Sequence, residues 1–267
     1  MVVRNFSQST ITSYKAAILR VYGYFNLPLE GLTDHDLVRF VCHLKEEKGL
    51  SRASMRIAVA SIKYFYKNVL GRWTQVENIP YPKKEKHIPA ILSGKEMRSL
   101  FDNCPNLKHR LMLKLIYSAG LRRSEIIHLS PSDLDWENMQ ITVRQGKGNK
   151  DRHTVLARAL RADYLLYTKQ YEPGPFLFFG RDKNIPITPS LLRWAMDKAI
   201  ERAGITKNVH LHSLRHSFAS HLLSLNTDIV TLQKLLGHED IRTTMVYLHL
   251  NHRPNNEPRS PLDIIYK

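Results

Sequence analysis

HLHSLRHSFASH, residues 210–221, places four histidines and one arginine within twelve positions. The spacing of its apolar side chains predicts a helix whose buried stripe includes Leu214 and Phe218. His212 and Arg215 are three positions apart, so a helix would bring them to one face. The polar side of this helix is therefore a candidate functional site, and the rest of the chain indicates what kind of site it is.

A metal centre is one interpretation of this stretch. His212 and His216 are four positions apart and would share a helix face, as two metal ligands can. Zinc requires a third protein ligand, however, and the glutamate of an H-E-x-x-H motif is absent. Arg215 lies between the two histidines and would repel a divalent cation. The sequence therefore favours a site without metal.

The charge balance indicates a polyanionic partner. Forty Lys and Arg side chains against 24 Asp and Glu give a net charge of +16 over 267 residues. An excess of this size is typical of proteins that bind nucleic-acid phosphates. No apolar run has the length of a membrane span, and Cys42 and Cys104 show no pairing pattern. We expect a globular protein of the cytoplasm with no membrane partner.

Changes in residue composition along the chain predict two domains joined by a linker. Apolar residues recur at helical spacing through residues 1–76, which we assign to a DNA-binding domain. Residues 77–92 contain three prolines and a lysine cluster, so we expect an extended, basic linker. A second domain spans residues 93–250. Residues 251–267 form a polar, proline-containing tail that ends in a short apolar patch.

The stretch MQITVRQGKGNKDRHTVL, residues 139–156, interrupts the helical pattern. β-Branched residues alternate on both sides of a turn that contains Gly146 and Gly148, which predicts a hairpin. Lys147 lies at the tip, where glycines let the backbone approach a ligand closely. The turn lacks the first glycine of a Walker loop, so ATP is not implied. The predicted fold class is mainly α with a small antiparallel β-sheet, arranged as a two-domain clamp.

Two further positions carry candidate chemistry. Arg122 follows a helix-ending glycine and precedes a helix with Glu125 in its first turn, a stiff position suited to a bidentate grip on phosphate. A salt bridge from Arg122 to an acidic neighbour such as Glu125 is the plainer interpretation. Tyr247 is expected on a helix that begins at Thr243, after a turn that holds His238. A tyrosine is a poor nucleophile unless cations surround it.

Basic side chains outside the second domain's motifs are candidates for contacts with DNA phosphates. The third helix, opened by Ser51, is expected to place a cationic row on one side while Ile57, Ile62 and Phe65 face inward. Such a row is usually a solvated helix face, but here it agrees with the overall charge. The predicted DNA-binding residues are Arg52, Arg56, Lys63, Lys84, Lys86 and Lys150.

Five motifs, in their order along the chain, resemble those of the tyrosine recombinases, the integrase family of site-specific DNA recombinases. They are GLRRSE, GKGNKDR, HSLRH, LLGHED and TTMVYLH. The nine-residue step from His238 to Tyr247 and the His-x-x-Arg of His212 and Arg215 are as in the family. The chain looks most similar to integron and transposon integrases and to Xer-like recombinases. The resemblance covers nearly the whole chain and implies a SAM-like core-binding domain followed by a catalytic domain.

The resemblance also implies a catalytic set. Its members are Arg122, Lys147, His212, Arg215, His238 and Tyr247. Arg122 and Arg215 would hold the non-bridging oxygens of the scissile phosphate and stabilise the charge of the transition state. Tyr247 would attack phosphorus and leave a 3′-phosphotyrosyl enzyme with a free 5′-hydroxyl.

The remaining motif residues would assist this step. Lys147 would protonate the leaving oxygen, His212 would act as an acid or base near the tyrosine, and His238 would hydrogen-bond the phosphate. Glu125 would support the arginines. The resemblance implies no catalytic role for His216 and His221, which we interpret as structural. Because the second strand's hydroxyl reverses the reaction, the resemblance implies that no cofactor is needed.

The implied partners are double-stranded DNA with paired half-sites and three further copies of the chain, forming a tetramer on two duplexes. The tail would dock on a neighbouring copy. Three alternatives stay open at this point. A type IB topoisomerase uses the same chemistry but rejoins the original strand, a DNA-binding factor would carry an inactive site, and a metal-dependent nuclease would use the histidines.

Overall fold

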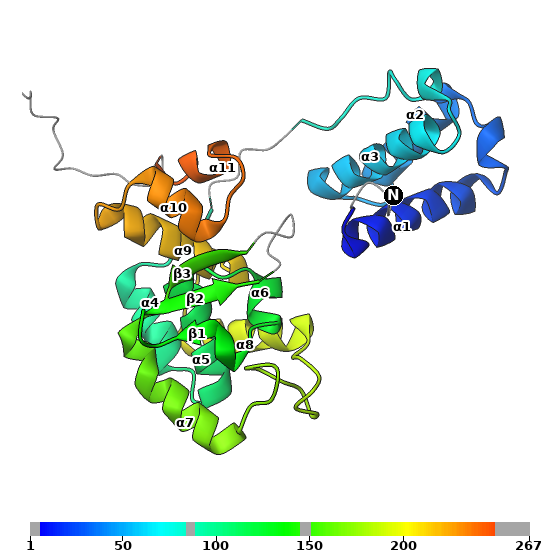
Figure 1. The fold of residues 1–267 in the computed structure, drawn as a ribbon. Helices are drawn as coiled ribbons and strands as arrows, with labels where there is room; N and C mark the ends of the chain where they lie inside the picture. The colour runs from blue at the N-terminus through cyan, green and yellow to red at the C-terminus, as the bar shows by residue number, and fades with distance from the viewer. Residues whose placement is uncertain (1–5, 84–88, 145–150, 249–267) are drawn as a thin grey trace, which may run out of the picture. The chain divides into compact units, whose positions relative to one another are not determined.

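The computed structural model describes residues 6–83, 89–144 and 151–248. The chain divides into two compact units, Met1–His87 and Ile88–Lys267, here named the N-terminal unit and the C-terminal unit (Figure 1). Several predicted positions lie outside the described residues: Lys84, Lys86, Lys147, Lys150 and the tail 251–267.

Helices build the N-terminal unit. They are α1 (Gln8–Phe25), α2 (Asp34–Glu46) and α3 (Arg52–Asn68), with the 3-10 turns η2 (Leu29–Gly31) and η3 (Trp73–Gln75). Thr33 caps α2 and Ser51 caps α3, because each side-chain oxygen accepts a hydrogen bond from a backbone N–H of the first turn. The start of α3 at Ser51 was predicted from the sequence. Helix α1 is capped by Ser7, whose side chain accepts a hydrogen bond from the backbone N–H of Thr10.

For one residue of α3, the prediction that its side chain faces inward was wrong. Ile57 is 48 % exposed, whereas Ile62 is fully buried and Phe65 packs against the core of the N-terminal unit. The buried stripe of α3 also includes Met55 and Val59. Each α-helical residue turns the chain by about 100°, so a residue halfway between two stripe positions faces the opposite side. Ile57 occupies that halfway position.

The C-terminal unit is mainly helical. Its described helices are α4 (Gly94–Asp102), α5 (Leu107–Ala119), α6 (Arg123–Ile127), α7 (Arg161–Tyr171), α8 (Pro189–Arg202), α9 (Leu211–Ser224), α10 (Ile229–Leu236) and α11 (Arg242–Met245), with the 3-10 turns η4 (Pro131–Asp133) and η5 (Arg158–Leu160). Helix α7 was not predicted from the sequence. Leu165 and Leu166 are 56 % and 58 % exposed, while Tyr167 is fully buried, so this helix carries little of the apolar periodicity that reveals a helix.

A small antiparallel sheet crosses the helices (Figure 1). Its strands are β1 (Leu134–Asp135), β2 (Gln140–Val143) and β3 (Arg152–Val155), in the order β1-β2-β3. Gln140 faces Val155 and Val143 faces Arg152, so the predicted hairpin is confirmed, although its tip lies outside the described residues. The mainly α fold class with a small antiparallel sheet is therefore confirmed.

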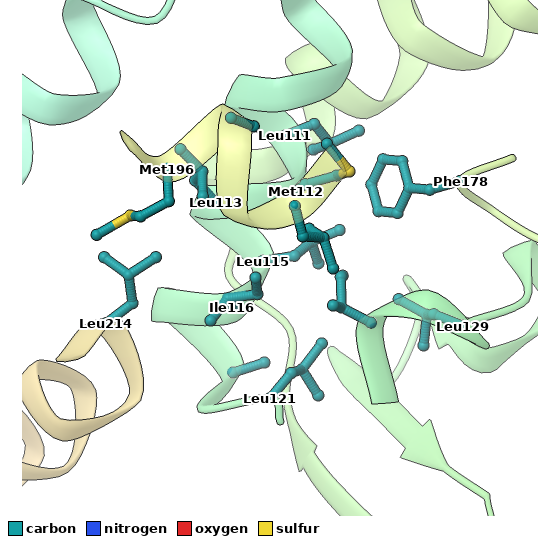
Figure 2. Close-up of a cluster of buried hydrophobic side chains, with 14 of the residues drawn as sticks. Leu111, Met112, Leu113, Leu115, Ile116, Leu121, Leu129, Phe178, Met196 and Leu214 are labelled. Atoms are coloured by element: carbon teal, nitrogen blue, oxygen red, sulfur yellow. The ribbon is translucent and has the colours of Figure 1, made fainter. Parts of the chain in front are cut away.

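Helix α5 forms the centre of the hydrophobic core (Figure 2). Leu111, Met112, Leu113 and Leu115 are fully buried, and neighbouring elements contribute Leu129, Phe178, Met196 and Leu214. Truncating one such leucine to alanine costs about 2–5 kcal/mol, because lost transfer energy adds to an unfilled cavity. This core fixes α5 and α9 against each other, and both carry or border the candidate site.

A smaller buried cluster joins α9 and α10 to the segment that follows α11. It contains Phe218, Ala219, Leu223, Leu232, Leu236 and Tyr247. Tyr247 was predicted on a helix, but α11 ends at Met245 and the tyrosine lies in the turn beyond it. Its ring is 3 % exposed, so packing rather than helix geometry holds it in place.

Candidate active site

Four residues of the predicted catalytic set come together in the C-terminal unit, three at the ends of helices and one within a helix. Arg122 is the N-cap residue of α6, two positions after Gly120, which ends α5 in the left-handed conformation. Arg215 lies in the middle of α9. His238 follows Gly237, which ends α10 in the left-handed conformation that glycine adopts without strain. Tyr247 follows α11. Of the two other members of the set, His212 lies in the first turn of α9, and Lys147 lies outside the described residues.

A buried carboxylate organises the arginines. Oε1 of Glu125 accepts a hydrogen bond from Arg122 Nη1 at 2.8 Å, and Oε2 accepts one from the Arg122 backbone N–H at 2.7 Å. Arg152 binds the same carboxylate with both terminal nitrogens, at 2.6 and 2.9 Å. Arg215 Nη1 lies 3.9 Å from Oε2. One negative charge therefore stands among three positive charges.

The protonation state of Glu125 follows from these contacts. Burial alone would raise the pKa of its carboxyl, but the hydrogen bonds and charge of Arg152, with those of Arg122, lower it below the ordinary value. The carboxylate is therefore ionised at neutral pH. The salt bridge from Arg122 to Glu125 that the sequence suggested is present, and it forms part of a larger cluster.

Arg215 is held rigidly inside the protein. Its side chain is 1 % exposed, and its two terminal nitrogens donate to the carbonyl oxygens of Gly120 and Leu236, both at 2.5 Å. Burial, with the nearby charge of Arg122, lowers the pKa of Arg215 to about 9, which leaves it protonated at neutral pH. Its guanidinium thus carries a fixed positive charge in a fixed orientation.

The end of α10 is bound to the same cluster. Arg122 Nη2 donates to the carbonyl of Gly237 at 2.8 Å, and Arg152 Nε donates to the carbonyl of Leu235 at 2.9 Å. Gly237 has φ +60°, and a Cβ at this position would lie 2.5 Å from Arg152 Cδ. Only glycine therefore allows both the left-handed turn and the close approach of Arg152.

His238 lies between Arg215 and α11. Its Nε2 is 3.1 Å from Arg215 Nη2, and its Nδ1 is 2.9 Å from Thr244 Oγ1. Burial and then the charge of Arg215 lower the pKa of His238 to about 4, so the ring is neutral at pH 7. Since arginine can only donate, Nε2 accepts and Nδ1–H donates to the threonine. The arginine thereby fixes the tautomer.

Tyr247 contacts a histidine that the sequence analysis left as structural. Its hydroxyl is 2.8 Å from His216 Nδ1. Burial raises the pKa of the Tyr247 hydroxyl, while the charges of Arg215 and Arg122 oppose that rise. His212 contacts the His216 ring edge-on, with 4.4 Å between centroids, and among the described residues it has no hydrogen bond to Tyr247. Among the described residues, His216 rather than His212 is thus the histidine at hydrogen-bond distance from the Tyr247 hydroxyl.

Two residues of this site were missed in the sequence. Arg152 belongs to the GKGNKDR motif, yet its partner Glu125 is 27 positions away, and no local pattern predicts that pairing. His216 is 31 positions from Tyr247. Its spacing of four from His212 was visible, but it suggested a metal pair. Across residues 6–83, 89–144 and 151–248, no three His, Cys, Asp or Glu side chains are grouped to hold a metal ion.

Three of the predicted DNA-binding residues lie on α3, in the N-terminal unit. Arg56 Nη1 donates to the carbonyl of Pro82 at 2.7 Å, and Lys63 Nζ donates to that of Glu77 at 3.0 Å. Both cations also lie over the ring of Tyr81, at 5.5 and 5.0 Å. Arg52 is exposed at the start of the helix. Among the helices in the described part of the chain, none is long and apolar enough to cross a membrane.

Comparison with known proteins identifies the family. Residues 90–253 match the model of the phage integrase family, and residues 1–75 match its N-terminal SAM-like domain. A Sinorhizobium fredii protein named as an integrase/recombinase, y4qK, is 36 % identical over 99 % of this chain and 86 % of its own length. The tyrosine recombinase XerC of Staphylococcus aureus is 29 % identical over 94 % of this chain and 89 % of its own.

A solved structure has the same fold. The XerH site-specific recombinase, in a post-cleavage complex with a palindromic difH substrate, aligns with a TM-score of 0.75 and 23 % identity over 93 % of this chain and 78 % of that one. The family match covers more than half of the sequence and includes the arginine–histidine–tyrosine cluster. The chain belongs to the phage integrase family and is a tyrosine-type site-specific DNA recombinase.

Proposed function

We propose that Tyr247 is the nucleophile that cuts DNA, and that the Glu125 cluster binds the scissile phosphate. The observation that carries this proposal is the charge of the cluster. Three arginines surround one carboxylate, so a net positive charge remains within a largely buried site. Such an excess is costly unless an anion joins it. A phosphodiester is the anion that this family handles.

Arg122 and Arg215 take different parts in phosphate binding. The side chain of Arg122 is 21 % exposed, and that of Arg215 is 1 % exposed. Arg122 is therefore the arginine that meets the phosphate from the surface, and Arg215 supplies fixed charge from beneath. Both act on charge that grows in the transition state, and because their positions are already fixed, little reorganisation is needed at the moment of reaction.

The proposed reaction exchanges one bond at phosphorus for another. The Tyr247 oxygen forms a bond to phosphorus, and the bond from phosphorus to the 5′ oxygen breaks. Lys147 gives a proton to the leaving oxygen. His212 acts as an acid or base near the tyrosine, and His238 hydrogen-bonds a phosphate oxygen. A 5′-hydroxyl from another strand then reverses the step. The phosphotyrosyl link retains the bond energy, so nucleotide hydrolysis is not required.

The DNA contacts and the assembly are part of the same proposal. Arg52, Arg56 and Lys63 on α3, with Lys84, Lys86 and Lys150, bind the phosphate backbone. Four copies act on two duplexes with paired half-sites, and residues 251–267 dock on a neighbouring copy. Solved relatives bound to DNA, such as XerH on its difH substrate, support the choice of partner.

Covalent trapping tests the proposed function. The full chain is incubated, in the presence of EDTA, with a pool of nicked duplexes of randomised sequence, and denaturation-resistant adducts are recovered and sequenced. We expect adducts that share a sequence motif and that disappear in Tyr247→Phe. Adducts that persist in Tyr247→Phe would exclude this tyrosine as the nucleophile. DNA cutting that EDTA abolishes, without any adduct, would instead favour a metal-dependent nuclease.

Strand exchange separates a recombinase from a topoisomerase-like activity. Two duplexes carrying the recovered motif, labelled differently, are mixed with the chain. Products that join the two labels support recombination. Relaxation of a supercoiled plasmid without joined products would support religation of the original strand only.

A further inference from the structure

Helix α9 carries two tyrosine–histidine pairs, and they differ in one respect. His221 Nδ1 is 2.9 Å from the hydroxyl of Tyr117 on α5, within the body of the unit. His216 Nδ1 is 2.8 Å from the hydroxyl of Tyr247, the proposed nucleophile. The first pair has an evident packing role between two helices that contact extensively. The second pair places an imidazole on the atom that must lose a proton.

We propose that His216 is a catalytic residue that accepts the Tyr247 proton when the tyrosine attacks phosphorus. This inference rests on the proposed function, in which Tyr247 is the nucleophile. In the forward step the hydroxyl proton moves to His216 Nδ1, the tyrosine oxygen bonds to phosphorus, and the 5′ oxygen leaves with a proton from Lys147. On rejoining, the incoming 5′-hydroxyl returns its proton to the lysine, and His216 returns its proton to Tyr247.

Geometry selects His216 over its neighbour. The rings of His216 and Tyr247 lie 5.6 Å apart between centroids, and their polar atoms are at hydrogen-bond distance, as a general base requires. His212 is one turn earlier on α9 and is exposed, and its contact is with the His216 ring. The acid or base role that the proposed function gives to His212 therefore passes to His216, which His212 contacts through its ring.

The surroundings keep His216 able to accept. Burial, with the charges of His212, His210 and Arg215, lowers its pKa to about 4, so its ring is neutral at pH 7 and one nitrogen carries a lone pair. Burial also raises the pKa of Tyr247, so the proton stays on the tyrosine in the protein without DNA. A bound phosphate offsets the positive charge of Arg122 and Arg215, and this change favours the protonated imidazole. Proton transfer is thereby coupled to the arrival of substrate.

Substitution of His216 is the first arm of the test. Adduct formation is measured in single turnovers on the duplex recovered by trapping, for the wild type, His216→Asn and His216→Gln. We expect a loss of about 100- to 1,000-fold, within the range of a general base. The matched control is His221→Asn, which removes the imidazole of the other pair and should cleave within about threefold of the wild type at equal folded fraction. Cleavage by both His216 variants at the wild-type rate, or faster, would overturn the proposal.

A less basic nucleophile provides the second arm. Replacement of Tyr247 by 3,5-difluorotyrosine lowers the pKa of its hydroxyl, so less help from a base is needed. We expect this change to raise the rate of adduct formation by His216→Asn at least about tenfold. If His216 had only a structural role, the less basic tyrosine would not raise the rate of His216→Asn. An unchanged rate would therefore overturn the proposal.

A third arm separates the two ends of the reaction. A substrate with a bridging sulfur at the 5′ position has a leaving group that needs no proton. It should restore cleavage in Lys147→Ala but not in His216→Asn. Restoration in both variants would assign His216 to the leaving group instead. Failure of the proposed function gives a different pattern, because the wild type would then form no Tyr247-dependent adduct on any substrate.

Discussion

The two basic regions of this protein hold their cations in opposite ways. In the C-terminal unit, Arg122, Arg152 and Arg215 are fixed by one buried carboxylate and by backbone carbonyls. In the N-terminal unit, Arg56 and Lys63 lie on the surface of α3, bound to backbone carbonyls and to the face of Tyr81. The first arrangement suits a single phosphate in one geometry. The second suits phosphates at any position along a duplex.

The same conservative change in both regions tests this difference most strongly. Arg215→Lys removes a planar, rigid set of donors, and we expect adduct formation to fall about 100- to 1,000-fold, as for the loss of a transition-state donor. Arg56→Lys keeps a surface charge and should cleave at nearly the wild-type rate. Single-turnover adduct formation on the recovered duplex measures both. Equal losses in the two variants would show that the regions do not differ in this way.

Removal of the central carboxylate is expected to have the next largest effect. Glu125→Gln leaves three arginines without their negative partner, and breaking such a buried pair costs about 3–5 kcal/mol of folding free energy. Misplacement of Arg122 should also lower cleavage by the folded protein about 100-fold. Chemical denaturation gives the first quantity, and adduct formation under conditions where the variant is folded gives the second.

Another buried carboxylate offers the control. Asp133 in η4 is 4 % exposed and pairs with Arg144 at 2.7 Å, as part of the sheet and its flanking turn. Asp133→Asn should lose stability without a specific loss of cleavage. If Glu125→Gln behaves in the same way, the Glu125 cluster contributes to folding alone, and the proposed phosphate site has to be placed elsewhere.

Much of this site was predictable because local patterns carry it. A glycine marked the end of α5, and the spacing of Leu214 and Phe218 predicted the buried stripe of α9. The hairpin was visible in its β-branched alternation. These features depend on neighbours a few positions away, which a single sequence displays directly.

The unpredicted part depends on contacts between distant segments. Nothing near Arg152 indicates that its guanidinium reaches Glu125 on another element, and nothing near His216 indicates that Tyr247 returns to it. The tyrosine was also expected on a helix, whereas the turn after α11 brings it back against α9. Tertiary packing decides such placements, and local periodicity does not report it.

Acidification should affect the buried site through its histidines. The pKa values of His216 and His238 are about 4 in the folded protein, below the ordinary value of 6.5. The unfolded chain therefore binds more protons between these values, so stability is lost as the pH falls from about 6.5 towards 4. We expect the thermal midpoint of the C-terminal unit to decrease over this range. His238→Gln should reduce the steepness of the decrease, and an unchanged profile would contradict the assignment.

The smallest effect is expected on the surface of α3. Lys63→Gln and Arg56→Gln each remove one cation that would contact a phosphate, so DNA affinity should fall only a few-fold at moderate salt. The slope of log K against log salt should decrease by about 1 for each lost contact. Arg39 on α2 is the control, because its charge pairs with Asp36 at 3.1 Å. Arg39→Gln should leave the slope unchanged. If the α3 variants also leave the salt slope unchanged, Arg56 and Lys63 are only part of a solvated helix face. The proposed phosphate contacts would then be confined to the C-terminal unit.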